Sequence, residues 1–204
     1  MRANSRGAAL IVTMMALLML VALTGALMPL TSSETAIAAN HRLAVQSLYA
    51  AGAVLKRAIR ELEAAPSWDD VLAGRRRATL WDGQTTRSLA DGAVLDLNAA
   101  TDALADAGAG RSGAGRGLRW RLYAHGPLGA VLPQDPTGGL LHAAVWVADD
   151  PDDADGDPLR DANGILMLHA AAVGPSLAQR AVQATLARPA PDQRPVVMSW
   201  TIVR

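Results

Sequence analysis

The first third of the sequence contains a run of 23 residues, Ala8–Leu30, without a charged side chain. At about 1.5 Å of rise per residue, a helix of this length crosses a hydrocarbon core of about 30 Å. Arg2 and Arg6 precede the run, and the next basic residue is Arg42. By the positive-inside rule, this distribution places the N-terminus in the cytoplasm and the rest of the chain across the membrane. The sequence therefore predicts a single-pass membrane protein.

Three interpretations of this segment compete. A secretory signal peptide has a basic start and an apolar core, but this run is long and lacks a clear Ala-x-Ala cleavage site. A plain membrane anchor needs only the apolar length. The third interpretation depends on Gly7, because a short basic leader ends at this glycine and directly adjoins the apolar run. We favour the third.

A basic leader that ends in glycine before an apolar run resembles the leader of type IV pilins and pseudopilins. The resemblance implies that a prepilin peptidase cuts between Gly7 and Ala8 and that the apolar helix is retained as part of a filament core. Pro29 matches the position of the kink-forming proline of pilins, and Gly25 lies four residues earlier. A proline within a helix removes a hydrogen bond and clashes with the preceding turn, so we expect a kink there.

One residue departs from the pattern of most pilins. Val12 occupies the fifth position after the implied cut, where most pilins carry a glutamate. PilX-type minor pilins and the GspK-type pseudopilin often lack this glutamate as well, so no buried charge has to be paired in the bilayer. The segment also resembles the PilX N-terminal region. The residues that carry this resemblance are Arg6, Gly7, Thr31, Ser32, Glu34 and Ala38 to Asn40.

The resemblance implies a minor pilin of the type IV pilus (fimbrium) that primes filament growth or lies at the tip. The implied partners are other minor and major pilins, prepilin peptidase, the inner-membrane assembly platform and the lipid bilayer. The implied location is the inner membrane with a periplasmic C-terminal domain, and finally the pilus tip on the cell surface. Two alternatives stay open: a pseudopilin of type II secretion, whose GspK-type members usually carry a large extra domain, and a single-span periplasmic binding module.

Beyond the membrane span, the apolar residues continue at helical spacing to about Ala65, where Pro66 ends the pattern. Ser67 is placed to cap a short helix over 68–72. The residues expected on one face of the long helix are Ile37, Ala44, Leu48, Leu55, Ile59 and Leu62. We therefore divide the chain into a leader (1–7), a long helix (8–65, membrane span 8–30) and a periplasmic globular domain (66–204).

The pattern after Gly117 is typical of β-structure, because short apolar runs alternate with Gly, Pro and Asp clusters and no long helical segment separates them. This predicts an antiparallel meander. Together with the long helix it predicts an α+β fold, and the resemblance implies the pilin arrangement in which the helix packs on the sheet while its membrane half projects. The predicted strands are Leu118–Ala124, Leu140–Ala148, Ile165–Val173, Arg180–Ala187 and Val196–Val203.

An acidic loop between two predicted strands carries seven aspartates and one asparagine within residues 149–163. Hard cations such as Ca²⁺ prefer several oxygen ligands, and a bound cation would relieve repulsion between the carboxylates. The predicted ligands are Asp153, Asp155, Asp157 and Asp161. The alternative is a solvated turn, in which aspartates cap their own backbone. The EF-hand pattern fails, because Pro158 replaces the required glycine.

Other functional classes find little support. Lys+Arg and Asp+Glu both number 19, so no basic surplus predicts a nucleic-acid partner, and the absence of cysteine excludes disulfides. A formal G-x-G-x-x-G occurs at Gly108, Gly110 and Gly113, but it precedes a predicted strand and not a helix. The four histidines lack zinc-enzyme spacing, although His142 and His169 can face each other on adjacent strands. We predict that the protein is not an enzyme and needs no cofactor other than the calcium considered above.

Overall fold

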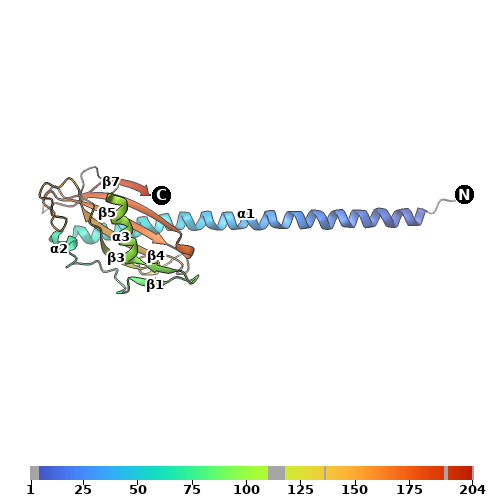
Figure 1. Ribbon diagram of the computed structural model, residues 1–204, viewed down its shortest axis with the longest axis horizontal. Helices are drawn as coiled ribbons and strands as arrows, with labels where there is room; N and C mark the ends of the chain where they lie inside the picture. The colour runs from blue at the N-terminus through green and yellow to red at the C-terminus, as the bar shows by residue number, and fades with distance from the viewer. Residues whose placement is uncertain (1–4, 110–117, 136, 191–192, 204) are drawn as a thin grey trace. The chain divides into compact units, whose positions relative to one another are not determined.

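The computed structural model describes residues 5–109, 118–135, 137–190 and 193–203. The chain forms two compact units, Met1–Arg42 and Leu43–Arg204, and each is described by itself below. The long helix α1, Ser5–Glu63, contributes residues to both units (Figure 1). It ends two residues before the predicted boundary at Ala65.

The first unit is the apolar part of α1. Its segment Gly7–Ala26 is long and apolar enough to cross a membrane. The two threonines in this segment are satisfied within the helix, since Thr13 Oγ1 donates to Ala9 O at 3.0 Å and Thr24 Oγ1 donates to Leu20 O at 2.6 Å. Internal hydrogen bonds of this kind are what a hydrocarbon environment requires of polar groups. The helix α1 runs without interruption through Gly25 and Pro29. The kink expected at Pro29 stays a prediction.

The second unit is built around the C-terminal part of α1. Leu55 and Leu62 are fully buried and Ile59 is nearly so, which confirms this part of the predicted apolar face. Leu48 is partly buried against the same core. Ile37, the first residue predicted for this face, is 68% exposed and belongs to the first unit.

A five-stranded antiparallel sheet shares a buried apolar core with this part of α1. Its strand order follows the chain, so each strand pairs with its sequence neighbour, as the predicted meander requires. The observed strands are β3 Arg121–Pro127, β4 His142–Asp149, β5 Ile165–Val173, β6 Gln179–Ala187 and β7 Val196–Val203. The last four agree with the prediction to within two residues. β3 begins three residues later than predicted, and its pairing with β4 shifts between Leu122 and Ala124.

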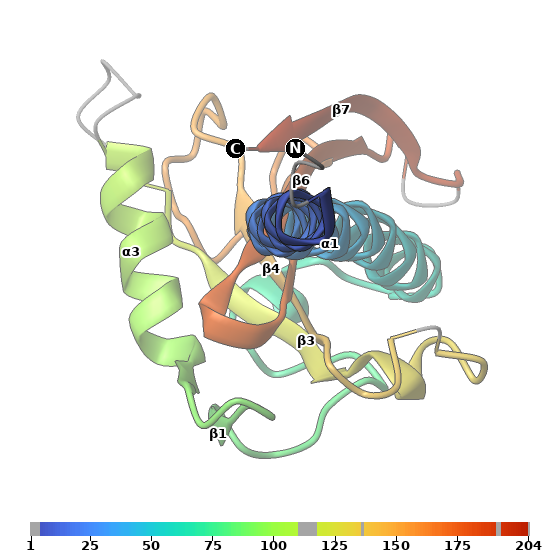
Figure 2. The same cartoon turned by 90° about the vertical axis from the view of Figure 1, so that its right-hand side faces the viewer.

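Both faces of the central strands β4 and β5 are covered. One face packs on α1 through alanines as well as larger residues, and Ala143, Ala170 and Ala172 are fully buried there. The other face packs on α3, Leu97–Ala109, and on a small hairpin of β1, Thr86–Ser88, and β2, Val94–Asp96 (Figure 2). β4 is consequently buried along its whole length.

The helix α3 extends over 13 residues. Its start is stabilised by Asp96, whose Oδ1 accepts hydrogen bonds from Asn98 N at 2.9 Å and Ala99 N at 3.1 Å. Its side chains reach the sheet, because Trp146 Nε1 on β4 donates to Thr101 Oγ1 at 2.7 Å. The glycine-rich segment predicted over 107–117 begins inside α3, and its residues 110–117 lie outside the described part of the chain.

The C-terminus of α1 is held by the residue that follows β6. Arg188 donates from Nη2 to Leu62 O at 2.7 Å and from Nη1 to Ala65 O at 3.2 Å. Its guanidinium carbon also lies 4.3 Å from the ring centroid of Trp68. The last carbonyls of a helix lack partners within the helix, so a basic side chain at this end both satisfies them and complements the helix dipole.

Candidate functional sites

The apolar helix carries the predicted processing and assembly residues. The Gly7–Ala8 peptide bond lies in the first turn of α1, and a side chain at Gly7 would meet no other atom within 4 Å. Val12 is 66% exposed within the described chain, with apolar neighbours along the helix. Gly25 is likewise open on all sides. The segment thus presents an uncharged surface that nothing in its own unit covers.

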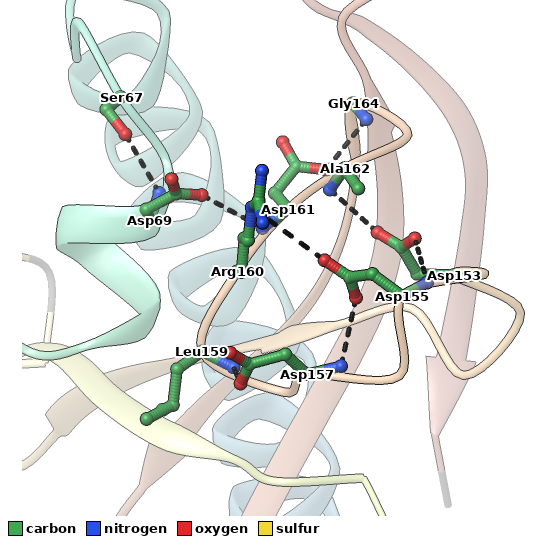
Figure 3. A network of polar contacts seen from close by, with 10 residues as sticks. All are labelled: Ser67, Asp69, Asp153, Asp155, Asp157, Leu159, Arg160, Asp161, Ala162 and Gly164. Carbon is green, nitrogen blue, oxygen red and sulfur yellow. Dashed lines mark hydrogen bonds and ion pairs between the residues drawn. The ribbon is translucent and has the colours of Figure 1, made fainter.

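The acidic loop connects β4 to β5 and is ordered by its own aspartates (Figure 3). Asp153, Asp155 and Asp157 each accept a hydrogen bond from the backbone N–H two residues further on, at 3.3, 2.9 and 3.0 Å. These are the local turns that aspartate favours by mimicking a backbone carbonyl. The repeated contacts show that much of the acidic pattern serves backbone geometry.

The loop is also tied to the short helix α2, Asp69–Leu72. Asp161 N donates to Asp69 Oδ1 at 2.9 Å, and Asp69 N donates to Ser67 Oγ at 3.1 Å. Figure 3 shows this chain of contacts. Ser67 therefore accepts a hydrogen bond at the start of the short helix, in line with its predicted role. The loop is fixed to a residue 92 positions earlier in the sequence.

Three carboxylates converge at the base of the loop. Asp149, Asp153 and Asp161 each offer an oxygen, and these oxygens lie within 4.8 Å of one another. Asp153 and Asp161 belong to the predicted calcium ligands, whereas Asp149 was missed because it is the last residue of a buried strand. Asp155 and Asp157 do not join this group; Asp155 Oδ2 lies 3.9 Å from Arg160 Nε.

Asp149 is the most perturbed member of this group. Only 6% of the residue is exposed, and its Oδ1 has no hydrogen-bond partner among the described residues. Burial, followed by the nearby charge of Asp153, raises the pKa of Asp149 to about 7. Burial also raises the pKa of Asp161, although backbone donors at Gly164 and Ile165 oppose this. Burial and the neighbouring carboxylate of Asp153 therefore both favour the protonated form of Asp149.

The buried histidines form a second cluster that the sequence did not predict. His142 and His169 do not face each other: His142 pairs with Val173 across β4 and β5, whereas His169 pairs with Trp146. His142 lies instead beside His125 of β3, with 5.9 Å between the ring centroids. Asp82 Oδ1 lies 3.0 Å from His125 Nδ1. No spacing rule links these three residues, since 17 to 43 positions separate neighbouring members of the trio.

Comparisons of the chain with protein-family models, with curated proteins and with solved structures found no match. The pilin resemblance therefore depends on the N-terminal residues quoted above, and the fold is described from the structure alone.

The raised pKa of Asp149 predicts a pH-dependent stability in the presence of a chelator. The folded state binds this proton more tightly than the unfolded state, so stability falls as pH rises from 3.8 to about 7. Asp149→Asn removes this loss and stabilises the protein at pH 8 by about 1.4 kcal/mol or more, which is the value of a shift of one pKa unit. Urea unfolding followed by tryptophan fluorescence at pH 5 and pH 8 measures both effects.

The matched control is Asp152→Asn, which makes the same chemical change at an exposed position of the same loop. We expect it to leave the pH dependence unchanged. An Asp149→Asn protein with the wild-type pH dependence would show that this carboxyl titrates normally.

Proposed function

We propose that the chain is a membrane-anchored, pilin-like assembly subunit, a minor pilin that primes filament growth or lies at the filament tip. One observation carries the proposal: a single helix, α1, supplies both an uncharged segment long enough to cross a membrane and the core helix of an antiparallel α+β domain. A secretory signal or a plain tether has no need to share a helix with the domain that follows it.

The proposed orientation and location follow from the charges around the apolar segment. Arg2 and Arg6 keep the N-terminus in the cytoplasm, and the second unit, Leu43–Arg204, lies in the periplasm. Prepilin peptidase removes residues 1–7, and the helix then packs among other pilin helices, where Val12 leaves no buried carboxylate to be paired. The two alternatives differ in this respect. A pseudopilin of type II secretion uses the same anchor, whereas a single-span binding module does not require cleavage after Gly7.

The second unit offers a surface for docking on neighbouring subunits. β7 is an edge strand with exposed apolar side chains on both of its faces, including Met198 at 66% and Ile202 at 53% exposure. A groove beside it is lined by Tyr49 and Gly52 of α1 and by Trp200. An exposed apolar edge strand tends to associate with other chains, so a protein that keeps one is expected to cover it in its assembly. We propose that neighbouring pilin subunits cover it.

Filament incorporation tests this proposal. In cells with an active pilus machinery, we expect the chain in the sheared filament fraction, detected by immunoblot. Ile202→Arg places a charge on β7 and lowers incorporation by about tenfold or more, as expected for the loss of an interface anchor. Val94→Arg is the matched control, because Val94 is 55% exposed but lies on β2 and not on β7. We expect this variant to be incorporated like the wild type.

Circular dichroism of the purified full-length variants confirms that both fold. The proposal fails if the wild-type chain never enters the filament fraction, or if the two arginine variants are incorporated equally well.

A second proposed function is calcium binding by the acidic loop. One observation favours it: the buried Oδ1 of Asp149 has no hydrogen-bond partner among the described residues. A cation held between Asp149, Asp153 and Asp161 would supply that partner. Ca²⁺ takes six to eight oxygen ligands at about 2.3–2.6 Å, so backbone carbonyls and water complete the shell. We therefore propose Asp149, Asp153 and Asp161 as the protein ligands of this ion. Asp155 and Asp157, which the sequence prediction also included, accept hydrogen bonds from the loop backbone.

Millimolar Ca²⁺ is expected to raise the Tm of the full-length protein, since a ligand that binds only the folded state stabilises it. Asp153→Asn removes a ligand and abolishes this shift. Asp155→Asn is the control and retains it, because the Asp155 carboxylate lies outside the cluster. An unchanged Tm in Ca²⁺, or an equal loss of the shift in both variants, contradicts the proposed ligand set.

A further inference from the structure

Two imidazole rings lie buried together on the sheet face that packs away from α1. His125 on β3 is fully buried and His142 on β4 is 3% exposed. His125 pairs with Ala144 in the sheet, and Ala144 is two residues beyond His142, so both histidine side chains project from the same face. Their ring centroids are 5.9 Å apart. His142 is the first residue of β4, whereas the acidic loop begins at the other end of this strand, at Asp149.

A carboxylate lies beside the two rings. Asp82 comes from the segment between α2 and β1, which runs along the free edge of β3 and pairs with it at Trp81 and His125. Its Oδ1 is 3.0 Å from His125 Nδ1. One donor atom from each of Asp82, His125 and His142 falls within 4.8 Å of the other two. Ligands of a tetrahedral Zn²⁺ at about 2.0–2.1 Å are about 3.4 Å apart, so a shift of roughly 1 Å per side chain closes the site.

The ring nitrogens lack the partners that buried polar atoms normally have. Both nitrogens of His125 and Nε2 of His142 are buried without a hydrogen bond among the described residues. The contact between His125 Nδ1 and Asp82 has the distance of an ion pair but not the angles of a hydrogen bond. Most buried polar side-chain atoms in native proteins have a hydrogen-bond partner, so three buried nitrogens without one at the same place call for a ligand.

We propose that Asp82, His125 and His142 form a binding site for Zn²⁺, with a water molecule as the fourth ligand. Two imidazoles and a carboxylate are ligands that suit Zn²⁺ and not Ca²⁺ or Mg²⁺, which prefer oxygen alone. The ion joins β3 and β4 to the segment that leads to the β1–β2 hairpin. It therefore acts as a structural clamp on the sheet face opposite α1.

The surroundings support the neutral, ligand-competent form of both rings. Burial lowers the pKa of His142 to about 4 and lowers the pKa of His125 as well, with Asp82 opposing and Arg87 adding to the effect. Zn²⁺ binds the neutral imidazole, so neither ring has to lose a proton at neutral pH. Arg77 also contributes to the lowered pKa of His125.

Arg87 on β1 positions the carboxylate. Its Nη2 contacts Asp82 Oδ2, which leaves Oδ1 directed at the histidines. Carboxylates that bind a metal are commonly held by a second hydrogen-bonding group in this way. The rings of Trp81 and His125 are in edge-to-face contact, with their centroids 4.4 Å apart. This contact further fixes the orientation of His125. Arg87 is thus a positioning residue and not a ligand.

Cobalt substitution in the full-length, tag-free protein tests the site directly. The protein is purified in detergent, stripped with a chelator and titrated with Co²⁺ in the presence of millimolar Ca²⁺, which occupies the oxygen-only loop. We expect the visible absorption of four-coordinate Co²⁺, its displacement by Zn²⁺, and a rise in Tm with Zn²⁺. His142→Gln lowers the affinity for Co²⁺ at least about 100-fold, because second-shell changes alone cost 10–100-fold.

The matched control is His169→Gln. His169 is also buried and on the same sheet, but its Nδ1 already lies 3.2 Å from Gln183 Nε2. We expect this variant to bind Co²⁺ like the wild type. Asp82→Asn, at a partly exposed residue, provides a second ligand variant if His142→Gln folds poorly. The absence of visible Co²⁺ bands in the wild type, or equal bands in His142→Gln and wild type, would overturn the proposal and leave a metal-free histidine pair.

Discussion

The structure of the second unit depends on the packing of α1 against the α1-facing side of the sheet. Small side chains on the strands, such as Ala143 and Ala170, belong to one buried apolar core with Leu55 and Leu62 of the helix. Arg188 then satisfies the last carbonyls of the helix. Because a sheet face needs a covering layer to exclude water, loss of this contact would expose the centre of the domain. The second unit is therefore incomplete without α1, the same helix that contains the apolar segment.

The sequence predicted those elements whose pattern is regular over many residues. The helical spacing of Leu55, Ile59 and Leu62 and the apolar runs of four strands agree with the structure, because each reflects burial of one continuous face. The predicted start of β3 was wrong, since a shifted register between Leu122 and Ala124 leaves little periodic signal.

The candidate sites were less accessible to sequence reasoning than the fold. The acidic loop was evident from its composition, but composition did not distinguish aspartates that close turns from aspartates that converge. Asp149 belongs to a strand, and Asp82 reaches His125 only because the segment before β1 pairs with the free edge of β3. Both clusters bring together residues that are distant in the sequence or hidden at an element boundary. In each of them, buried polar atoms without partners were the informative feature.

The mass of the N-terminal peptide of the mature protein tests the central proposal most directly. It is measured in membranes from cells that do and do not contain prepilin peptidase. A chain that begins at Ala8 only when the peptidase is present, and retains Gly7 when it is absent, is the predicted result. A chain that keeps Met1 or Arg2 in the presence of active peptidase, or one cut beyond Leu30, would contradict a retained pilin-type helix.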